Sequence, residues 1–273
     1  MPEPTALLIL TTLGLGVVAG MVGTLLGLGG GVFLVPFLVL ALDIPFHTAA
    51  AISLTTVIAT STAVSAAAAG RQLINLRLGM VLEVATAFGG LTGGITAYTL
   101  SPRSLQLLFG TVAAAIGLVT LARLNRQDSA AGPGRGRFGA TYFDPPSGRM
   151  VTYAVKRLPI AIAASFVAGN ISTLLGVGGG IVKVPVLNAW CGVPMRAAAA
   201  TSAFMIGVTA TAGAVIYYGR GDLIPQLAAA AVLGVHVGSA AGMRFGQRLG
   251  QRALSLLMAI VLFTVAVLML VRS

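Results

Sequence analysis

Residues 24–31 read Thr-Leu-Leu-Gly-Leu-Gly-Gly-Gly, and residues 173–180 read Thr-Leu-Leu-Gly-Val-Gly-Gly-Gly. Each stretch interrupts a long apolar run and is followed by a shorter apolar run. Clustered glycines break a helix, because each costs about 1 kcal/mol relative to alanine. Backbone groups freed at membrane depth are tolerated only inside protein or beside an aqueous cavity. The two stretches therefore predict helix–loop–helix hairpins, at 6–42 and 157–191, with the glycines at the tips.

The composition indicates an integral membrane protein. Of the 273 residues, 57% are apolar types and 8% are charged, against roughly 25% charged in a typical soluble domain. Several apolar runs are long enough, or nearly so, to cross a hydrocarbon core of about 30 Å as helices. These runs cover 6–28, 47–69, 78–100, 104–124, 157–176, 197–218, 223–243 and 253–271. We therefore expect an all-α, polytopic protein that crosses the lipid bilayer of the cell membrane several times.

The two halves of the chain are related by an internal repeat. In a register of 149 residues the two glycine stretches coincide, and Val35-Pro36 meets Val184-Pro185. The register predicts a first transmembrane repeat at 1–124, a polar, cytoplasmic linker at 125–156 and a second transmembrane repeat at 157–273. Each repeat would hold about four to five helical segments, and paired halves of this kind are typical of secondary transporters.

The positive charges leave two arrangements of the halves open. If each glycine break is a kink in a spanning helix, the halves are parallel, and 11 Lys and Arg residues lie inside against five outside. If each break is a hairpin tip, the halves are inverted, and the division is 13 inside against three outside. Both counts leave Lys183 at membrane depth. Inversion is favoured, because it obeys the positive-inside rule better.

At the glycine motifs the chain resembles the sulfite exporter TauE/SafE family, also called the toluene-sulfonate uptake permeases. The similarity covers nearly all of the chain except the linker. It implies transport of small sulfur-containing anions, such as sulfite, sulfonates, sulfoacetate or thiosulfate. The residues that carry the resemblance are Gly27-Leu28-Gly29-Gly30-Gly31, Val35-Pro36, the run from Gly176 to Pro185 and the run from Ala198 to Thr209.

The glycine tips are the first candidates for an anion site. A helix that begins after Gly31 or Gly180 presents unpaired N–H groups and a partial positive charge of about half a unit. This geometry binds anions without a cationic side chain. The alternative is that the glycines only allow close helix packing. The predicted substrate-binding residues, around an anion held between the tips near the membrane centre, are Thr24, Gly29, Gly30, Gly31, Thr173, Gly178, Gly179, Gly180, Lys183 and Ser202.

Lys183 and three hydroxyls extend this prediction. Lys183 lies on the first turn of the short run 181–191, and its repeat partner is Leu34. An ionisable residue at membrane depth is costly and usually functional, although a snorkelling lysine is the alternative. The hydroxyls of Thr24, Thr173 and Ser202 would donate hydrogen bonds to sulfonyl oxygens. Their alternative is bonding to the backbone of their own helices.

Glu83 and His236 are candidates for proton coupling, because both lie within apolar runs. In the repeat register Glu83 aligns with Val232, so His236 lies one helical turn further along the equivalent helix. A carboxylate and an imidazole at related depths would relay protons. The alternatives are that Glu83 faces the headgroups near Arg77 and that His236 is a packed polar residue.

The remaining features narrow the function. One cysteine and two histidines offer no pattern for a metal, and the absence of a Walker-type phosphate loop argues against ATP-driven transport. We therefore predict a secondary transporter with no cofactor, no metal and no enzymatic activity. Basic residues at segment ends and few aromatics argue against nucleic acid. A channel-like anion conduit and a non-transporting membrane enzyme or assembly subunit are the alternatives. The substrate anion, the direction, the coupling ion and a homo-oligomeric state stay open.

Overall fold

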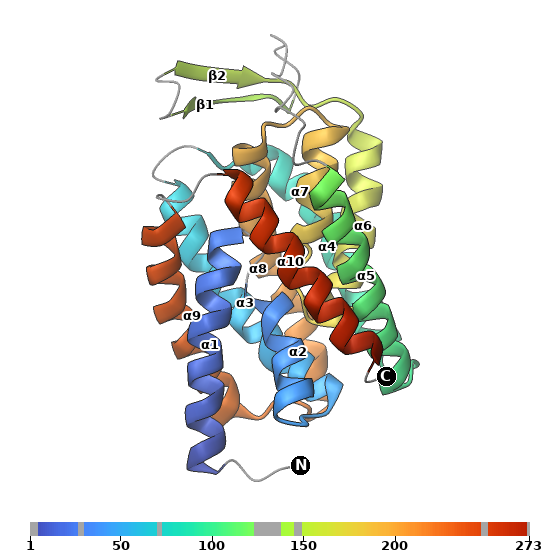
Figure 1. Cartoon of the computed structure of the whole chain (residues 1–273). Helices are drawn as coiled ribbons and strands as arrows, with labels where there is room; N and C mark the ends of the chain where they lie inside the picture. Colours follow the sequence, from blue (N-terminus) through green and yellow to red (C-terminus); the bar gives the residue numbers. More distant parts are fainter. Residues whose placement is uncertain are drawn as a thin grey trace.

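A computed structural model describes residues 5–26, 30–69, 73–122, 138–144, 149–246 and 251–271. Most of these residues lie in helices. Six of the described helices are long and apolar enough to cross a membrane. The predicted all-α, polytopic class is therefore confirmed (Figure 1). The helices are α1 (Ala6–Leu26), α2 (Gly31–Ala41), α3 (Phe46–Ala69), α4 (Leu76–Ala97), α5 (Pro102–Ala122), α6 (Leu158–Leu175), α7 (Gly180–Ala189), α8 (Met195–Gly219), α9 (Pro225–Gly246) and α10 (Gln251–Val271).

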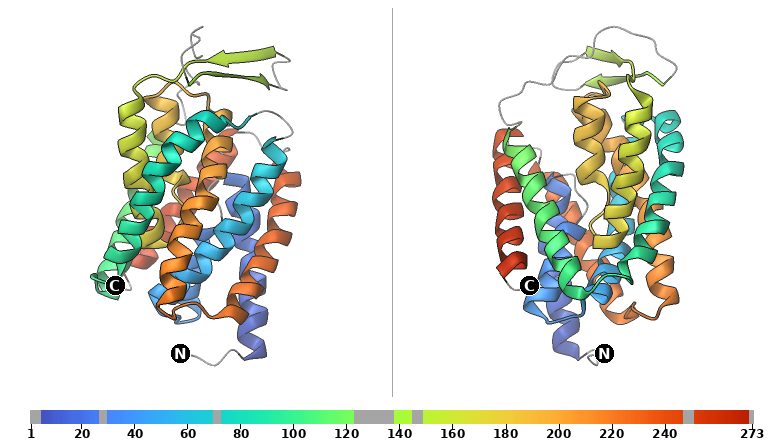
Figure 2. Two further views of the ribbon diagram at one scale, coloured as in Figure 1. Left: turned by 180° about the vertical axis from the view of Figure 1, so that it is seen from behind. Right: turned by 90° about the vertical axis from the view of Figure 1, so that its right-hand side faces the viewer.

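Two short helices follow the glycine stretches and turn back. In Figures 1 and 2, α2 returns toward the end of the molecule at which α1 begins, and α7 returns toward the end at which α6 begins. The α1–α2 hairpin starts from one end of the bundle, and the α6–α7 hairpin starts from the opposite end. The second tip consists of Gly176, Val177, Gly178 and Gly179, whereas residues 27–29 of the first tip lie outside the described residues.

Glycines bring the hairpins into close contact with their neighbours. Helix α1 packs along α9, and α6 packs along α4. A Cβ atom added to Gly20 or Gly169 would lie 2.3 or 2.1 Å from a carbonyl oxygen of the facing helix. At Gly89 and Gly238 the distance would be 2.0 Å in both cases. Backbone therefore meets backbone at these crossings. Gly20 and Gly169 are equivalent positions of the 149-residue register, and so are Gly89 and Gly238.

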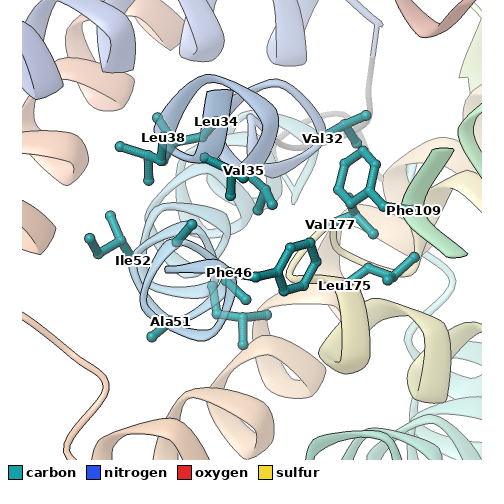
Figure 3. Packing of buried hydrophobic residues seen from close by; sticks show 14 of the residues in the cluster. Val32, Leu34, Val35, Leu38, Phe46, Ala51, Ile52, Phe109, Leu175 and Val177 are labelled. Carbon is teal, nitrogen blue, oxygen red and sulfur yellow. The ribbon is translucent and has the colours of Figure 1, made fainter. Parts of the chain in front are cut away.

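The apolar core joins α2 and α3 to the second tip. Figure 3 shows Val35 of α2 and Phe46 of α3 packed near Leu175 and Val177, with Phe109 of α5 beside them. All five side chains are buried. A small cavity between the second tip, α2, α5 and α10 has only apolar lining residues. The side chains that line this cavity therefore offer no hydrogen bond to an anion.

A two-stranded sheet covers one end of the bundle, within the segment interpreted as a linker. Strands β1 (Ala140–Asp144) and β2 (Arg149–Tyr153) pair antiparallel. The Asn75 side chain accepts from the Leu78 N–H at 3.1 Å, and its amide donates to the Phe138 carbonyl at 2.8 Å and the Tyr153 hydroxyl at 3.2 Å. Tyr153 is buried. The sheet is thus fixed to the start of α4, which the polar composition of the segment did not indicate.

The inverted arrangement predicts which residues share a membrane face. Thr5, Arg103 and Met150 are exposed. Each is replaced by cysteine in turn, in a protein whose own cysteine has been removed by Cys191→Ser. Inverted halves place positions 5 and 103 on one face and position 150 on the other. Labelling of oriented vesicles with a membrane-impermeant thiol reagent checks this. Labelling of positions 5 and 150 from the same side, opposite to 103, would establish the parallel arrangement instead.

Candidate anion site

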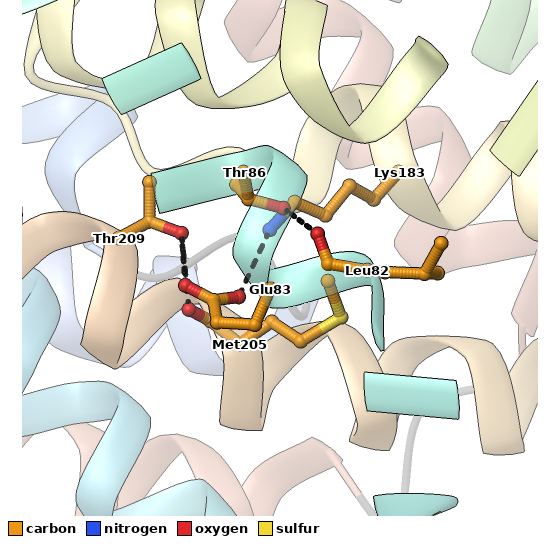
Figure 4. A network of polar contacts seen from close by, with 6 residues as sticks. All are labelled: Leu82, Glu83, Thr86, Lys183, Met205 and Thr209. Atoms are coloured by element: carbon orange, nitrogen blue, oxygen red, sulfur yellow. Dashed lines mark hydrogen bonds and ion pairs between the residues drawn. The ribbon is translucent and has the colours of Figure 1, made fainter. Parts of the chain in front are cut away.

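Three helices bring an ion pair and a hydroxyl together in the interior. Lys183 of α7 places its Nζ atom 3.8 Å from Oε2 of Glu83 on α4 (Figure 4). Thr209 of α8 donates a hydrogen bond to the other carboxylate oxygen, Oε1, at 2.8 Å. Lys183 is 1% exposed and Glu83 is 8% exposed. The lysine therefore does not snorkel in this structure, and the carboxylate does not face headgroups.

The second tip determines where the lysine lies. Helix α7 begins at Gly180, and the Lys183 N–H donates to the Gly179 carbonyl at 3.2 Å, so Lys183 is on the first turn. A Cβ atom at Gly179 would lie 3.3 Å from Lys183 Cε and 3.0 Å from the Ala168 carbonyl oxygen. The side chain therefore lies against the tip. A bulkier residue at position 179 would displace the ammonium group and also crowd the hairpin.

Several buried polar atoms in the described part of the chain, both charged groups of the pair among them, have no hydrogen-bond partner. They are Ser172 Oγ, Thr173 Oγ1, Ser202 Oγ, Glu83 Oε2 and Lys183 Nζ. Leaving such a group unsatisfied costs roughly 1–3 kcal/mol. Buried polar groups in native proteins nearly always have partners, among them water or a ligand. The two unsatisfied charged atoms of the pair therefore mark a place where a polar ligand would be stabilised.

Thr173 lies close to Thr209, the residue of α8 that bonds Glu83. A Cβ atom at Gly90, two turns beyond Glu83, would lie 3.0 Å from Thr173 Oγ1 and 3.3 Å from Thr209 Cγ2. Thr173 and Thr209 are thus neighbours across Gly90. Ser202 precedes Thr209 by seven residues, so the two share one face of α8. Thr173 therefore lies near Thr209, the residue that bonds Glu83, and Ser202 lies about two turns away on the same face of α8.

The two glycine tips also meet. A Cβ atom at Gly31 would lie 2.7 Å from the Gly176 carbonyl oxygen and 2.6 Å from Ser53 Oγ. The Ser53 hydroxyl donates to that carbonyl at 2.5 Å. Gly176 and Gly178 have φ angles of +70° and +75°, a region that strongly favours glycine. Neither α2 nor α7 has a side-chain cap at its start.

Three predicted residues lie elsewhere or cannot be placed. The Thr24 hydroxyl donates to Ser239 Oγ at 2.8 Å, which joins α1 to α9. His236 is exposed on α9, a helix that packs on α1 and α3. The structure thus does not bring His236 to Glu83, and the relay between them has no support. Gly29 lies outside the described residues. Among the described residues, no group of three His, Cys, Asp or Glu side chains is arranged to hold a metal.

An aromatic cluster lies on another side of the second tip, and the sequence did not predict it. The Tyr217 hydroxyl donates to the Thr173 carbonyl at 3.2 Å. The Tyr98 ring stacks on His47 with centroids 4.9 Å apart, and the Tyr98 hydroxyl donates to Asp222. The cluster comprises His47, Tyr98, Tyr217, Arg220 and Asp222, with the Arg220 guanidinium 4.6 Å from the Tyr98 ring centroid. It closes the end of the bundle next to Thr173.

The pairing of Glu83 with Lys183 was also missed by sequence reasoning. The 149-residue register relates equivalent positions and says nothing about contacts between α4 and α7. The available signal was that Lys183 and Glu83 are opposite charges within apolar segments. Such charges usually face the interior of the bundle and pair with each other.

Known proteins are similar to the chain over nearly its whole length. The family described as Sulfite exporter TauE/SafE matches residues 12–269. The chain is similar to the Probable membrane transporter protein YunE of Bacillus subtilis (strain 168), with 28% identity over 256 residues. That alignment covers 91% of this chain and 92% of the relative. No solved structure matches the chain. Both glycine stretches and the Glu83–Lys183 pair lie within the matched region.

Proposed function

The chain belongs to the sulfite exporter TauE/SafE family of membrane transporters, and from this premise we propose that it moves small sulfur-containing anions by secondary transport. The substrate class is that of sulfite, sulfonates, sulfoacetate and thiosulfate. The anion binds beside Lys183, between the glycine tips, and the hydroxyls of Thr173 and Ser202 donate to its oxygens. The observation that carries the proposal is the buried ammonium group of the Glu83–Lys183 pair, together with the buried hydroxyls that have no partner within the described residues.

The chemistry of the site supports an oxyanion. Sulfonyl and sulfite oxygens accept hydrogen bonds, and the Lys183 ammonium donates them. Ser172, Thr173 and Ser202 add hydroxyls whose oxygens have no partner within the described residues. The uncapped starts of α2 and α7 add partial positive charge. An anion at this depth loses much of its hydration, and these groups replace the lost interactions with water.

Counterflow separates a transporter from a channel-like conduit with the same site. Proteoliposomes preloaded with unlabelled anion are expected to accelerate uptake of the same labelled anion, because a transporter exchanges one for the other across the membrane. The panel is sulfite, methanesulfonate, sulfoacetate and thiosulfate, with sulfate and chloride for comparison. With the membrane potential clamped by equal potassium on both sides and valinomycin, a channel would show no such acceleration. If no sulfur anion of the panel is bound or moved, the proposed function is wrong.

Variants of the hydroxyls test the location of the site. Thr173→Val and Ser202→Ala each remove one hydrogen bond of about 0.5–1.5 kcal/mol, so each is expected to weaken anion affinity by roughly two- to tenfold. Thr264→Val is the matched control, because Thr264 is exposed on α10 and its hydroxyl bonds the Ile260 carbonyl of its own helix. Binding is measured by scintillation proximity with the labelled anion. Unchanged affinity in both site variants would place the anion elsewhere.

A further inference from the structure

The Glu83 carboxylate occupies the position that an anion would take beside Lys183. The distance of 3.8 Å between Nζ and Oε2 is longer than a hydrogen bond. Thr209 holds Oε1, whereas Oε2 has no hydrogen-bond partner in the described structure. The carboxylate is thus held in place at one oxygen and only loosely associated with the ammonium group at the other. A second anion must compete with it for the same cation.

The titratable side chains of the helices that pack around the pair lie far from it. Helices α6 and α8 pack against α4. Helix α6 contains no titratable side chain, and Lys183 is the one titratable residue of α7. On α8, Arg196 precedes Thr209 by 13 residues and Tyr217 follows it by eight, which are about 20 and 12 Å along the helix. On α4 itself, Arg77 is exposed and about 9 Å away along the helix. These groups are too distant to compensate a second buried negative charge.

Without compensation, an anion would leave the site with a net negative charge. Glu83 and Lys183 together carry no net charge when both are ionised. A monovalent anion would add one negative charge to a buried region, and burying an uncompensated charge is strongly unfavourable. The starts of α2 and α7 attract the anion but add no net charge, because the opposite end of each helix carries the opposite partial charge. A proton on Glu83 restores neutrality, because the ammonium group then pairs with the anion. The protonated carboxyl also becomes a donor, which adds a hydrogen bond to the anion.

We propose that the anion and the Glu83 carboxylate compete for Lys183, and that Glu83 takes up one proton for each anion bound. The inference rests on the proposed function and adds the coupling ion to it. The proton comes from the solution, bonds to the Glu83 carboxylate and leaves on the other side together with the anion. Lys183 stays an ammonium group throughout, and no other bond forms or breaks. The protein is therefore a proton–anion symporter, electroneutral for a monovalent substrate.

Methanesulfonate is the probe, because it is the anion of a strong acid and does not titrate between pH 5 and 9. Where Glu83 is ionised in the empty site, the wild-type affinity for methanesulfonate is expected to fall about tenfold for each unit by which the pH rises. This slope follows if binding of one anion requires uptake of one proton. A pH indicator should report one proton taken up per methanesulfonate bound by the purified protein. In proteoliposomes, an inwardly directed proton gradient should drive uptake, whereas a potassium diffusion potential should not.

Glu83→Gln removes the competing charge and the proton site while it keeps the size of the side chain. Its methanesulfonate affinity is expected to be independent of pH, with no proton uptake, and its transport to respond to the membrane potential. Glu83→Asp is the conservative variant, in which pH dependence should persist. Thr264→Val, exposed on α10, should behave as wild type in every assay.

The outcomes separate this inference from the proposed function. Wild-type binding of methanesulfonate without proton uptake and without pH dependence would overturn the proton coupling and leave anion transport standing. The same conclusion would follow if wild-type uptake responded to the membrane potential and not to the proton gradient. If neither the wild type nor Glu83→Gln binds methanesulfonate, the proposed coupling is contradicted, whereas the proposed function is contradicted only if no sulfur anion of the panel is bound or moved. The wild-type proton count decides the question even if Glu83→Gln fails to fold.

Discussion

Alanine at Lys183 is expected to weaken binding of the sulfur anion more than tenfold, which corresponds to more than about 1.4 kcal/mol. The ammonium group is 1% exposed, and in the described structure Lys183 is the cation that lies within ion-pair distance of Glu83. Two helix starts supply only about half a charge each. Without the lysine, the anion would meet the Glu83 carboxylate unshielded. The measurement is equilibrium binding of labelled methanesulfonate or sulfite to the purified protein.

The same substitution is expected to destabilise the protein, and a second variant separates the two effects. Removing one partner of a buried ion pair typically costs roughly 3–5 kcal/mol, because the other charge is left uncompensated. The double variant Lys183→Ala with Glu83→Gln contains neither charge, so its thermal stability should recover. Its anion affinity should stay low. Recovery of both properties would show that Lys183 acts only as the structural partner of Glu83.

Lys183→Arg completes the series. The guanidinium keeps the charge, but its planar shape and longer reach differ from those of an ammonium group. Helix α7 leaves little room, since Gly179 lies against the lysine side chain. We expect partial anion affinity, between the wild type and Lys183→Ala. Affinity in Lys183→Ala equal to that of the wild type would exclude the lysine from the site.

The sequence predicted the helical segments well, for a physical reason. A membrane-spanning helix must be apolar over its whole length, and the glycine stretches are local breaks in that pattern. Helices α2 and α7 therefore occupy 31–41 and 180–189, close to the short runs expected at 31–42 and 181–191. The depth of Lys183 follows from the same local pattern.

Contacts between helices could not be predicted in the same way. Thr24 and Thr173 occupy equivalent positions in the repeat, yet one hydroxyl bonds Ser239 and the other has no partner in the described structure. A register of equivalent positions does not say which helix faces which. His236 was grouped with Glu83 for this reason, although it is exposed on α9. The sheet was missed because its strands are short and lie within a polar segment.

Valine at Gly20 is expected to prevent stable folding, whereas valine at Gly14 on the same helix should be tolerated. A Cβ atom at Gly20 would lie 2.3 Å from the Val235 carbonyl oxygen, and at Gly14 nothing lies within 4 Å. The contact at Gly20 is with backbone, so no side-chain rotation relieves it. Helices α1 and α9 would have to separate, with loss of the close packing that small residues provide in membranes.

The repeat extends this prediction to the other half of the molecule. Gly238 on α9 and Gly89 on α4 are 149 residues apart, and a Cβ atom at either would lie 2.0 Å from a facing carbonyl oxygen. Overpacking costs typically 1–3 kcal/mol where side chains can adjust, and we expect at least that cost where backbone faces backbone. Gly89→Val and Gly238→Val should therefore lose most of the monodisperse peak in fluorescence-detected size-exclusion chromatography. Gly14→Val should keep it, because its side chain meets open space. A folded Gly238→Val protein with wild-type thermal stability would show that α1 and α9 do not pack this closely in the membrane.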